Sequence, residues 1–352
     1  MAENRKWMIY GATGYTGRLV AHEAKRQGLS PILAGRGETV AALAAELGLP
    51  SLVFSLSDVA ATRRALDGVS VVAHCAGPFA ATSAPMIDAC VLARAHYVDI
   101  TGEIDVFVAA QHRHNEAQAA GIVVCPGVGF DVIPTDCVAA CLIEALPDAT
   151  RLALGFKAGG ARSPGTARTA IEGMPQGARV RKHGAIVAEP LGQRTRTIDF
   201  GTGPRLAVAI PWGDVATAYF TTGIANIEVF VPASARSVAR LRRLDRIRPL
   251  LGLAPVRALL SRLAASRNPG PSQKQRESGK TWVWGEARSD NGDVRIARLS
   301  TSNGYRLTAD GVLMAVRALL VRAPGGGYFT PSQLLGARCV ERLPGCSAIA
   351  IE

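Results

Sequence analysis

The feature that most constrains this chain is a glycine-rich turn near its first residue. Residues 8–19 read MIYGATGYTGRL, so an apolar run ends in three spaced glycines before a helical pattern begins. At this spacing the first glycine makes the strand-to-helix turn, the second admits a ligand close to the backbone, and the third lets the helix pack near the strand. The amides at the start of such a helix favour a pyrophosphate, because they lie at the positive end of the helix dipole. The pattern predicts a dinucleotide site with contacts from Gly11, Thr13, Gly14, Tyr15, Thr16 and Gly17.

The residue after the second predicted strand distinguishes between two dinucleotides. About twenty residues beyond the glycine motif, NAD enzymes carry Asp or Glu for the ribose 2′-hydroxyl. Here the segment reads Leu33-Ala34-Gly35-Arg36. A guanidinium cannot accept a hydrogen bond, but it can pair with a 2′-phosphate. The sequence therefore favours NADP(H) as the cofactor, with a solvated basic residue at a strand end as the alternative role of Arg36.

The order of apolar runs predicts an α/β fold with two domains. From Lys6 to Cys125, strand-like runs alternate with helical patterns, which indicates βαβ units and a doubly wound parallel sheet. Beyond residue 150, strand-like runs follow one another without a helix between each pair, and Tyr219–Phe220 is one of them. We expect an N-terminal Rossmann domain over residues 1–148 and a mixed-sheet α/β substrate domain over 149–322. A C-terminal segment, 323–352, is expected to pack back on the first domain.

Composition narrows the classes of partner and compartment. The net charge of +12 suits anionic partners, but aromatic residues make up only 5% of the chain and no nucleic-acid motif is present, so we expect no nucleic-acid function. The seven cysteines show no Cys-x-x-Cys pairing, and we expect neither disulfides nor a metal site. The sequence shows no signal peptide and no apolar run long enough to span a bilayer, which predicts a cytoplasmic protein.

Four further loops follow predicted strands and supply candidate cofactor contacts. For these loops, a purely structural role is the alternative to a role in binding. Asp58 would either bind the adenine amino group or cap the next helix. The turn at residues 76–79 would either contact the nicotinamide half of the cofactor or be a plain Gly-Pro turn. The loop at residues 101–103 contains a glycine turn. The loop at residues 126–136 is glycine-rich and would let the backbone approach the cofactor or substrate. The candidate contacts are Asp58, Ala76, Gly77, Pro78, Phe79, Thr101, Gly102, Gly129 and Phe130.

Position alone suggests candidates for a proton donor. Glu103 would act in catalysis or serve only as a negative charge at a helix N-terminus. Asp131 and Asp136 would cap a helix that starts near Ile133, which is the favoured role for Asp136. The three candidate catalytic residues are Asp131, Glu103 and Tyr219. No tyrosine is followed four residues later by lysine, so the proton-transfer pair of short-chain dehydrogenases is missing.

Read together, these motifs resemble the saccharopine dehydrogenase-like oxidoreductases, in particular a short bacterial branch that includes trans-acting enoyl reductases. The resemblance is dense over residues 8–145, thin over 150–320, and resumes weakly at 327–331. It implies an NADP-binding Rossmann domain followed by a mixed α/β domain that supplies the substrate pocket. The residues that carry it are Gly11–Gly17, Leu33–Arg36, Gly77–Phe79, Ala89-Cys90, His96–Glu103 and Gly129–Asp136.

The sequence supports three functions in order of preference. The first is an NADPH-dependent reductase, most of all an enoyl reductase acting on a lipid- or polyketide-type substrate. The second is a saccharopine-type or imine reductase, although the charge-pairing groups that an amino-acid substrate needs cannot be placed. The third is a non-catalytic NADP-sensing protein. Oligomerisation stays open.

One strongly basic segment, residues 234–267, is helical and amphipathic. It is expected either to dock an acidic carrier protein, a CoA phosphate or an anionic membrane surface, or to be only a solvated helix face.

Overall fold

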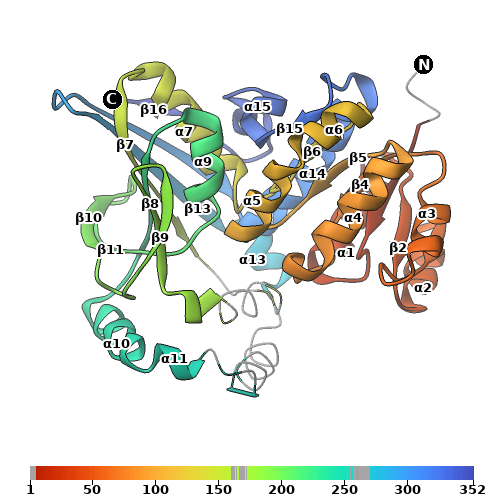
Figure 1. Ribbon diagram of the computed structural model, residues 1–352, viewed down its shortest axis with the longest axis horizontal. Helices are drawn as coiled ribbons and strands as arrows, with labels where there is room; N and C mark the ends of the chain where they lie inside the picture. Colours follow the sequence, from red (N-terminus) through yellow and green to blue (C-terminus); the bar gives the residue numbers. More distant parts are fainter. Residues whose placement is uncertain are drawn as a thin grey trace. The chain divides into compact units, whose positions relative to one another are not determined.

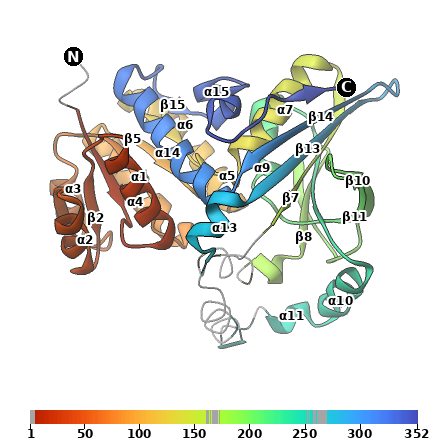
Figure 2. The same cartoon turned by 180° about the vertical axis from the view of Figure 1, so that it is seen from behind.

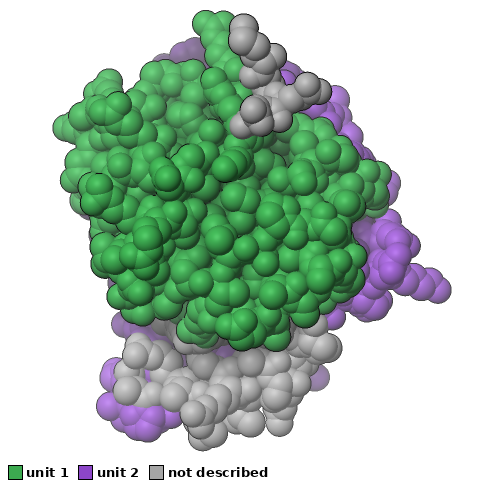
Figure 3. Space-filling model, turned by 90° about the vertical axis from the view of Figure 1, so that its right-hand side faces the viewer, with its two compact units in different colours: residues 1–133, 305–336 green, residues 134–304, 337–352 purple. Residues whose placement is uncertain are grey.

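The computed structural model describes residues 5–159, 163, 165, 171, 173–251, 253, 255, 256, 260 and 270–352. The chain divides into two compact units (Figure 3). Unit 1 comprises residues 1–133 and 305–336, and unit 2 comprises residues 134–304 and 337–352. In the described part of the chain, every helix is too short or too polar to cross a bilayer.

Unit 1 is built on a seven-stranded parallel sheet (Figure 1). Its strand order is β15-β6-β5-β4-β1-β2-β3, so the chain reverses its direction of winding between β1 and β4. The central strands are almost wholly buried because helices cover both faces, which explains their near-continuous apolar sequences. The strands are β1 (Lys6–Tyr10), β2 (Ile32–Gly35), β3 (Ser51–Val53), β4 (Val69–His74), β5 (His96–Asp99), β6 (Val123–Cys125) and β15 (Gly327–Tyr328).

Helices connect consecutive strands of this sheet and cover it from both sides. α4, α5 and α6 lie in front of the sheet in Figure 1, whereas α1 and α14 lie in front of it in Figure 2. This arrangement is the doubly wound α/β fold that the sequence predicts. The helices are α1 (Tyr15–Arg26), α2 (Thr39–Leu47), α3 (Val59–Ala65), α4 (Phe79–Ala93), α5 (Ile104–His112), α6 (His114–Ala120), α14 (Gly304–Val321) and α15 (Pro331–Leu335).

Unit 2 contains a nine-stranded mixed sheet. Its main path is β10-β11-β12-β7-β13-β14-β16, and the hairpin of β8 and β9 joins it through β12. Among the described strands of this sheet, β12 and β7 pair in parallel and the other pairs are antiparallel. The strands are β7 (Ala149–Ala158), β8 (Ala178–Lys182), β9 (Ala185–Glu189), β10 (Thr195–Asp199), β11 (Pro204–Ala209), β12 (Asn226–Pro232), β13 (Lys280–Ser289), β14 (Val294–Ser302) and β16 (Ala350–Ile351).

Different structures pack on the two faces of the second sheet. α7 (Ile133–Ala145) packs on one face, where a Cβ at Gly285 would lie 2.4 Å from Val138 and 2.8 Å from Leu142. The opposite face buries an apolar cluster that includes Phe200, Phe230 and Trp284. The other helices of unit 2 are α9 (Asp214–Thr222), α10 (Ala235–Arg246), α11 (Arg248–Leu251) and α13 (Gln273–Ser278), with 3-10 turns η1 (Met174–Gln176) and η2 (Cys339–Arg342).

Several elements differ from the sequence-based expectation. Tyr219–Phe220 is helical, inside α9, whose five consecutive residues Asp214 to Ala218 are buried, so the first part of the helix is enclosed on all sides. The strand β8 was not expected, since its Arg-Val-Arg-Lys sequence has little apolar character. In the basic segment 234–267, the structure describes two short helices, α10 and α11, and the arginines at positions 257, 262 and 267 lie outside the described residues.

The limits of the two units also differ from the predicted domain limits. Unit 2 begins with α7, at residue 134, rather than at residue 149. Residues 305–336, which contain most of α14 together with β15, belong to unit 1, while residues 337–352 belong to unit 2. The reason is strand pairing: β15 pairs with β6 of the first sheet, and β16 pairs with β14 of the second.

The contact between α1 and β1 leads to a stability prediction. A Cβ at Gly17 would lie 2.2 Å from the carbonyl oxygen of Gly11, which is backbone and cannot swing away. We expect Gly17→Ala to lower the free energy of unfolding by about 1–3 kcal/mol and to weaken NADP binding. Urea denaturation measures the first effect. Gly325→Ala is the matched control, because a Cβ there meets nothing within 4 Å; equal losses in the two variants would contradict the prediction.

Candidate dinucleotide-binding site

The candidate site lies at the carboxyl edge of the first sheet, where the winding direction reverses. In open α/β sheets, ligands bind in the crevice outside the strand ends at this switch point. β1 lies between β2 and β4 here, with Tyr10 beside Ala34 and His74. The amide of Cys75 donates to the carbonyl of Tyr10 at 2.7 Å, and the amide of Gly11 donates to Ala34 at 2.8 Å. These bonds hold the ends of β2, β1 and β4 side by side at one edge of the sheet, together with the loops that follow them.

The turn from β1 into α1 has the geometry that a pyrophosphate needs. Gly11 has a φ of +83°, and a Cβ there would lie 2.7 Å from the amide nitrogen of Ala76. Gly14 is the N-cap residue of α1, is exposed, and has no side chain to cover the helix amides. The first amides of a helix have no carbonyl partner within it, so an anion can accept from them. The residues therefore fit a dinucleotide phosphate at the N-terminus of α1.

The ends of β2 and β3 carry the two candidates for the adenosine half. Arg36 directly follows β2 and is exposed, so its guanidinium is accessible to the 2′-phosphate of a bound dinucleotide. Asp58 is the N-cap of α3, and its carboxylate accepts from the amide of Ala61 at 2.8 Å. The capping role considered for Asp58 is thus present, and a contact with adenine stays a prediction.

Glu103 has a structural role at a helix N-terminus. Its carboxylate accepts from the amides of Phe79 at 3.0 Å and Ala80 at 2.8 Å, at the N-terminus of α4. The loop after β5 is therefore tied to the loop after β4, which contains a cis peptide between Gly77 and Pro78. Glu103 holds a helix N-terminus, as the non-catalytic alternative proposed, although the helix is α4 rather than its own α5.

Asp131 lies against the same loop. A Cβ at Gly102 would be 2.8 Å from the Asp131 carboxylate, so only glycine at position 102 allows this approach. Burial raises the pKa of Asp131 to about 7. An acid with a pKa near neutrality can give up and regain a proton at working pH. Among the three residues suggested as proton donors, Asp131 has the environment that best fits this role.

A buried carboxylate, Asp99, organises the loops around Asp131. It accepts hydrogen bonds from the Tyr97 hydroxyl at 2.7 Å, from the Thr101 amide at 2.9 Å and from the Gly127 amide at 2.8 Å. Burial raises its pKa to about 6, although these three bonds act in the opposite direction. Sequence reasoning missed Asp99. The available signal was its place at a strand end in an otherwise apolar run, where a buried carboxylate needs such partners.

α14 supports the loop that follows β6. A Cβ at Gly129 would lie 2.9 Å from the Thr308 methyl group, and the amide of Phe130 donates to the Thr308 hydroxyl at 3.0 Å. Thr308 lies 178 residues away in sequence, so no local pattern could have identified it. Gly129 and Phe130 therefore lie in a rigidly held loop, and their contact with a cofactor stays a prediction.

Two other residues considered in the sequence analysis, Tyr219 and Asp136, belong to unit 2. Tyr219 lies in unit 2, on α9, where its ring covers the guanidinium of Arg181 at 4.0 Å. Asp136 is in the first turn of α7 and accepts from the Thr221 hydroxyl at 2.5 Å. Among the described residues, no group of three or more His, Cys, Asp or Glu side chains is placed to hold a metal ion.

Comparison with known proteins identifies the first unit. Residues 7–125 match the model of the saccharopine dehydrogenase NADP-binding domain. The human saccharopine dehydrogenase-like oxidoreductase is 28% identical over 150 residues, which cover 37% of this chain and 35% of that protein. A trans-acting enoyl reductase of Mycobacterium leprae is 32% identical over 139 residues, covering 37% of this chain and 33% of that protein. The chain thus covers about a third of the length of these curated relatives.

Two matches extend over almost the whole chain. A Mycobacterium tuberculosis protein provisionally named as a trans-acting enoyl reductase is 24% identical over an alignment of 406 residues, gaps included. The alignment covers 96% of this chain and 94% of that protein. The apo structure of saccharopine dehydrogenase (L-Glu forming) from Saccharomyces cerevisiae covers 99% of both chains with a TM-score of 0.66 and 12% identity. The second match shows that both units have a known fold.

Arg36 provides a test of cofactor choice. We expect Arg36→Asp to weaken NADPH binding about ten- to a hundredfold, the equivalent of one lost charged hydrogen bond to phosphate. NADH lacks the 2′-phosphate, so its affinity should stay constant or rise. Fluorescence titration with both dinucleotides measures the change. Arg63→Asp, on the exposed side of α3, is the control; an equal loss for both dinucleotides would show that Arg36 does not read the phosphate.

The geometry and the comparisons agree on the cofactor. The glycine turn, the uncovered start of α1 and the exposed arginine after β2 lie at the switch point of a doubly wound sheet. The matching domain model covers β1 to β6, which are the strands that carry these features. Residues 7–125 match the saccharopine dehydrogenase NADP-binding domain, and the site described in unit 1 fits NADP(H) as its cofactor.

Proposed function

We propose that this protein is an NADPH-dependent enoyl reductase that acts on a lipid- or polyketide-type substrate. The observation that carries the proposal is the end-to-end match with the Mycobacterium tuberculosis protein provisionally named as a trans-acting enoyl reductase. The missing Tyr/Lys pair is consistent with it, because that pair serves carbonyl reduction in short-chain dehydrogenases.

The reaction adds a hydride and a proton across a carbon–carbon double bond. When bound, NADPH supplies the hydride to the β-carbon. The chain's part is to supply the proton to the α-carbon, and Asp131 is our candidate donor because burial raises its pKa to about 7. Gly102 keeps the space in which this carboxyl group lies. Glu103 is less suited, since backbone amides of α4 already bind both of its oxygens.

Substrate specificity tests the proposal directly. We expect NADPH oxidation with an α,β-unsaturated acyl thioester and none with an α-keto acid plus an amino acid. NADPH carrying deuterium at C4 should place the label on the β-carbon, which mass spectrometry locates. Turnover only with the keto acid and amine would instead establish a saccharopine-type or imine reductase. Tight NADP binding without turnover of either substrate would favour a sensing role.

The donor role of Asp131 predicts a pH dependence. The carboxyl group must be protonated before it can donate, so kcat should fall as the pH rises through about 7. Asp131→Asn should remove this limb of the profile and lower kcat by about two orders of magnitude. Glu103→Gln should leave the limb in place. A profile of Asp131→Asn with the same limb as the native protein would show that another group supplies the proton.

The exposed arginines of α10 are the basis of a proposal about the partner that presents the substrate. Val238 is the buried residue of this helix, and Asp245 accepts from the amide of Leu191, so one side faces the protein. Arg236, Arg240, Arg243 and Arg246 are exposed. Ile247 and Leu250, which follow, are 47% and 57% exposed. A cationic face beside exposed apolar side chains fits an acidic carrier protein.

Charge reversal at Arg240, Arg243 and Arg246 to Glu tests this docking surface. We expect kcat/KM for a carrier-bound substrate to fall at least tenfold at low salt, and kcat/KM for the corresponding CoA thioester to change little. Reversal of Arg205, Arg295 and Arg322, which are exposed elsewhere, is the control for net charge. Equal losses on both substrates would contradict carrier docking. We also propose a cytoplasmic location, because none of the seven cysteines, all of which lie in the described part of the chain, forms a disulfide.

A further inference from the structure

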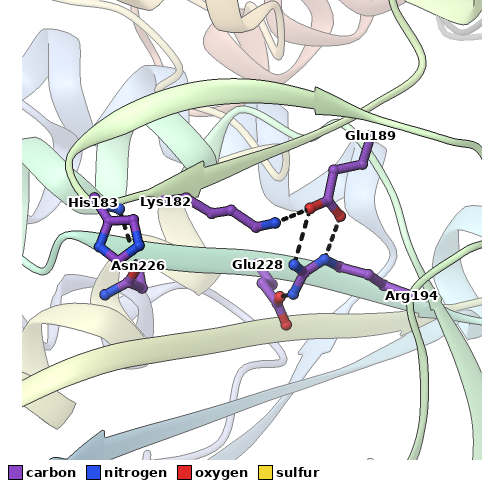
Figure 4. Close-up of polar contacts among 6 residues, drawn as sticks. All are labelled: Lys182, His183, Glu189, Arg194, Asn226 and Glu228. Atoms are coloured by element: carbon purple, nitrogen blue, oxygen red, sulfur yellow. Dashed lines mark hydrogen bonds and ion pairs between the residues drawn. The ribbon is translucent and has the colours of Figure 1, made fainter.

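A charged cleft lies on the sheet of unit 2. It has a volume of about 670 Å³ and is lined by residues from β7, β8, β10, β12 and β13. The charged side chains around it form ion pairs with one another, as Figure 4 shows for Arg194 with Glu189 and Glu228. Arg196 is paired in the same way with Glu286, at 2.9 Å. These charges therefore compensate one another within the sheet.

A buried histidine of unit 1 lies next to the candidate dinucleotide site without being one of its candidate contacts. His74 is the last residue of β4 and is 0% exposed. Its ring lies among those of Tyr10, Phe79 and Tyr97, with centroids 5.4 to 6.0 Å away. Burial lowers the pKa of the imidazole to about 3. The ring is therefore neutral at working pH and is not the proton donor of the reaction.

The neutral ring is linked by hydrogen bonds to the turn at residues 76–79. Its Nε2 lies 3.0 Å from the hydroxyl oxygen of Thr82, which is in the first turn of α4. The Thr82 hydroxyl donates to the carbonyl oxygens of Ala76, at 2.7 Å, and Pro78, at 3.1 Å. Carbonyl oxygens only accept, and a hydroxyl has a single proton, so His74 must donate from Nε2. The bonds thus run in one direction, from His74 through Thr82 to the turn.

The same turn is also held through its amides. The Glu103 carboxylate accepts from the amides of Phe79 at 3.0 Å and Ala80 at 2.8 Å. The turn lies close to the glycine motif, because a Cβ at Gly11 would be 2.7 Å from the amide nitrogen of Ala76. In a doubly wound fold the dinucleotide crosses the crevice at this switch point. Carbonyls and amides of the turn are thus fixed where the nicotinamide half of the cofactor is expected.

We propose that His74 is a positioning residue that acts through Thr82 to orient the turn at residues 76–79 for the nicotinamide half of NADP(H). The neutral Nε2–H group fixes the Thr82 hydroxyl, and this hydroxyl fixes the carbonyl of Ala76. A rigidly held turn binds a ligand without first losing conformational freedom, which favours affinity. The inference rests on the proposed function only in that NADP(H) is the cofactor, and it holds whichever bond is reduced.

Calorimetric titration with two ligands separates the halves of the cofactor. NADPH contains the nicotinamide half, whereas adenosine 2′,5′-bisphosphate contains only the adenosine half. We expect Thr82→Val to weaken NADPH about tenfold, because the Ala76 carbonyl and the Nε2–H of His74 lose their partner. The affinity for the bisphosphate should not change. Thr82→Ser keeps the hydroxyl and should keep the native affinity for NADPH.

A threonine of unit 2 provides the matched control. The hydroxyl of Thr222, on α9, also donates to the carbonyl four residues earlier, that of Ala218, at 2.6 Å. Thr222→Val should therefore leave the affinities for both ligands unchanged. Equal losses for both ligands in Thr82→Val would show a general structural role and overturn the proposal, as would native NADPH affinity in that variant.

His74→Phe tests the first bond of the chain. It keeps an aromatic ring in apolar surroundings but has no Nε2–H donor, and we expect it to weaken NADPH about threefold or more. In the Thr82→Val background the same substitution should cause no further loss, since the two residues act in one chain. Additive losses would overturn the role of His74. These titrations need no substrate, so their outcome is independent of whether the protein reduces enoyl thioesters.

Discussion

The close approach of α1 to the end of β1 is the constraint on which the rest of unit 1 depends. A Cβ at Gly17 would come within 2.2 Å of the Gly11 carbonyl oxygen, so the helix can lie this near only without one. This approach directs the N-terminus of α1 to the crevice between β1 and β4. The helix dipole then acts on the phosphates where the strand order leaves room for a ligand. A bulkier contact would move the helix start away from that crevice.

The loops along the same edge of the sheet show how similar carboxylates acquire different roles. Asp99 accepts three hydrogen bonds and ties the loop after β5 to the loop after β6. Glu103 joins the loop after β5 to the N-terminus of α4. Burial raises the pKa of Asp131 to about 7, whereas at Asp99 three hydrogen bonds act against the effect of burial and its pKa is about 6.

Unit 2 follows a different physical principle. One face of its sheet is covered by α7, and the other combines an apolar cluster with a cleft full of charges. Arg196 joins these two regions, since it forms an ion pair with Glu286 and lies 5.0 Å from the centre of the Trp284 ring. Guanidinium groups can stack on aromatic rings while they keep hydrogen bonds to carboxylates. Arg196 is therefore stabilised by packing against the apolar cluster as well as by its ion pair.

Local patterns in the sequence predicted those parts of the protein whose residues lie close together along the chain. The glycine spacing at positions 11, 14 and 17, the arginine after β2 and the alternation of strands with helices sufficed for the Rossmann fold and for NADP. These signals are readable because turns, helix starts and strand periods involve residues near one another in the chain.

Contacts between residues that are far apart in the chain became visible only in the folded structure. Glu103 binds α4 across 24 residues, Thr308 supports Phe130 across 178, and the helix of Tyr219 was mistaken for a strand because its apolar run is short. The charged cleft on the sheet of unit 2 is lined by residues from five strands, and these residues form no sequence motif with one another. Such contacts arise from strand order and packing, so a local pattern cannot encode them, whereas the turn that binds the dinucleotide is local from end to end.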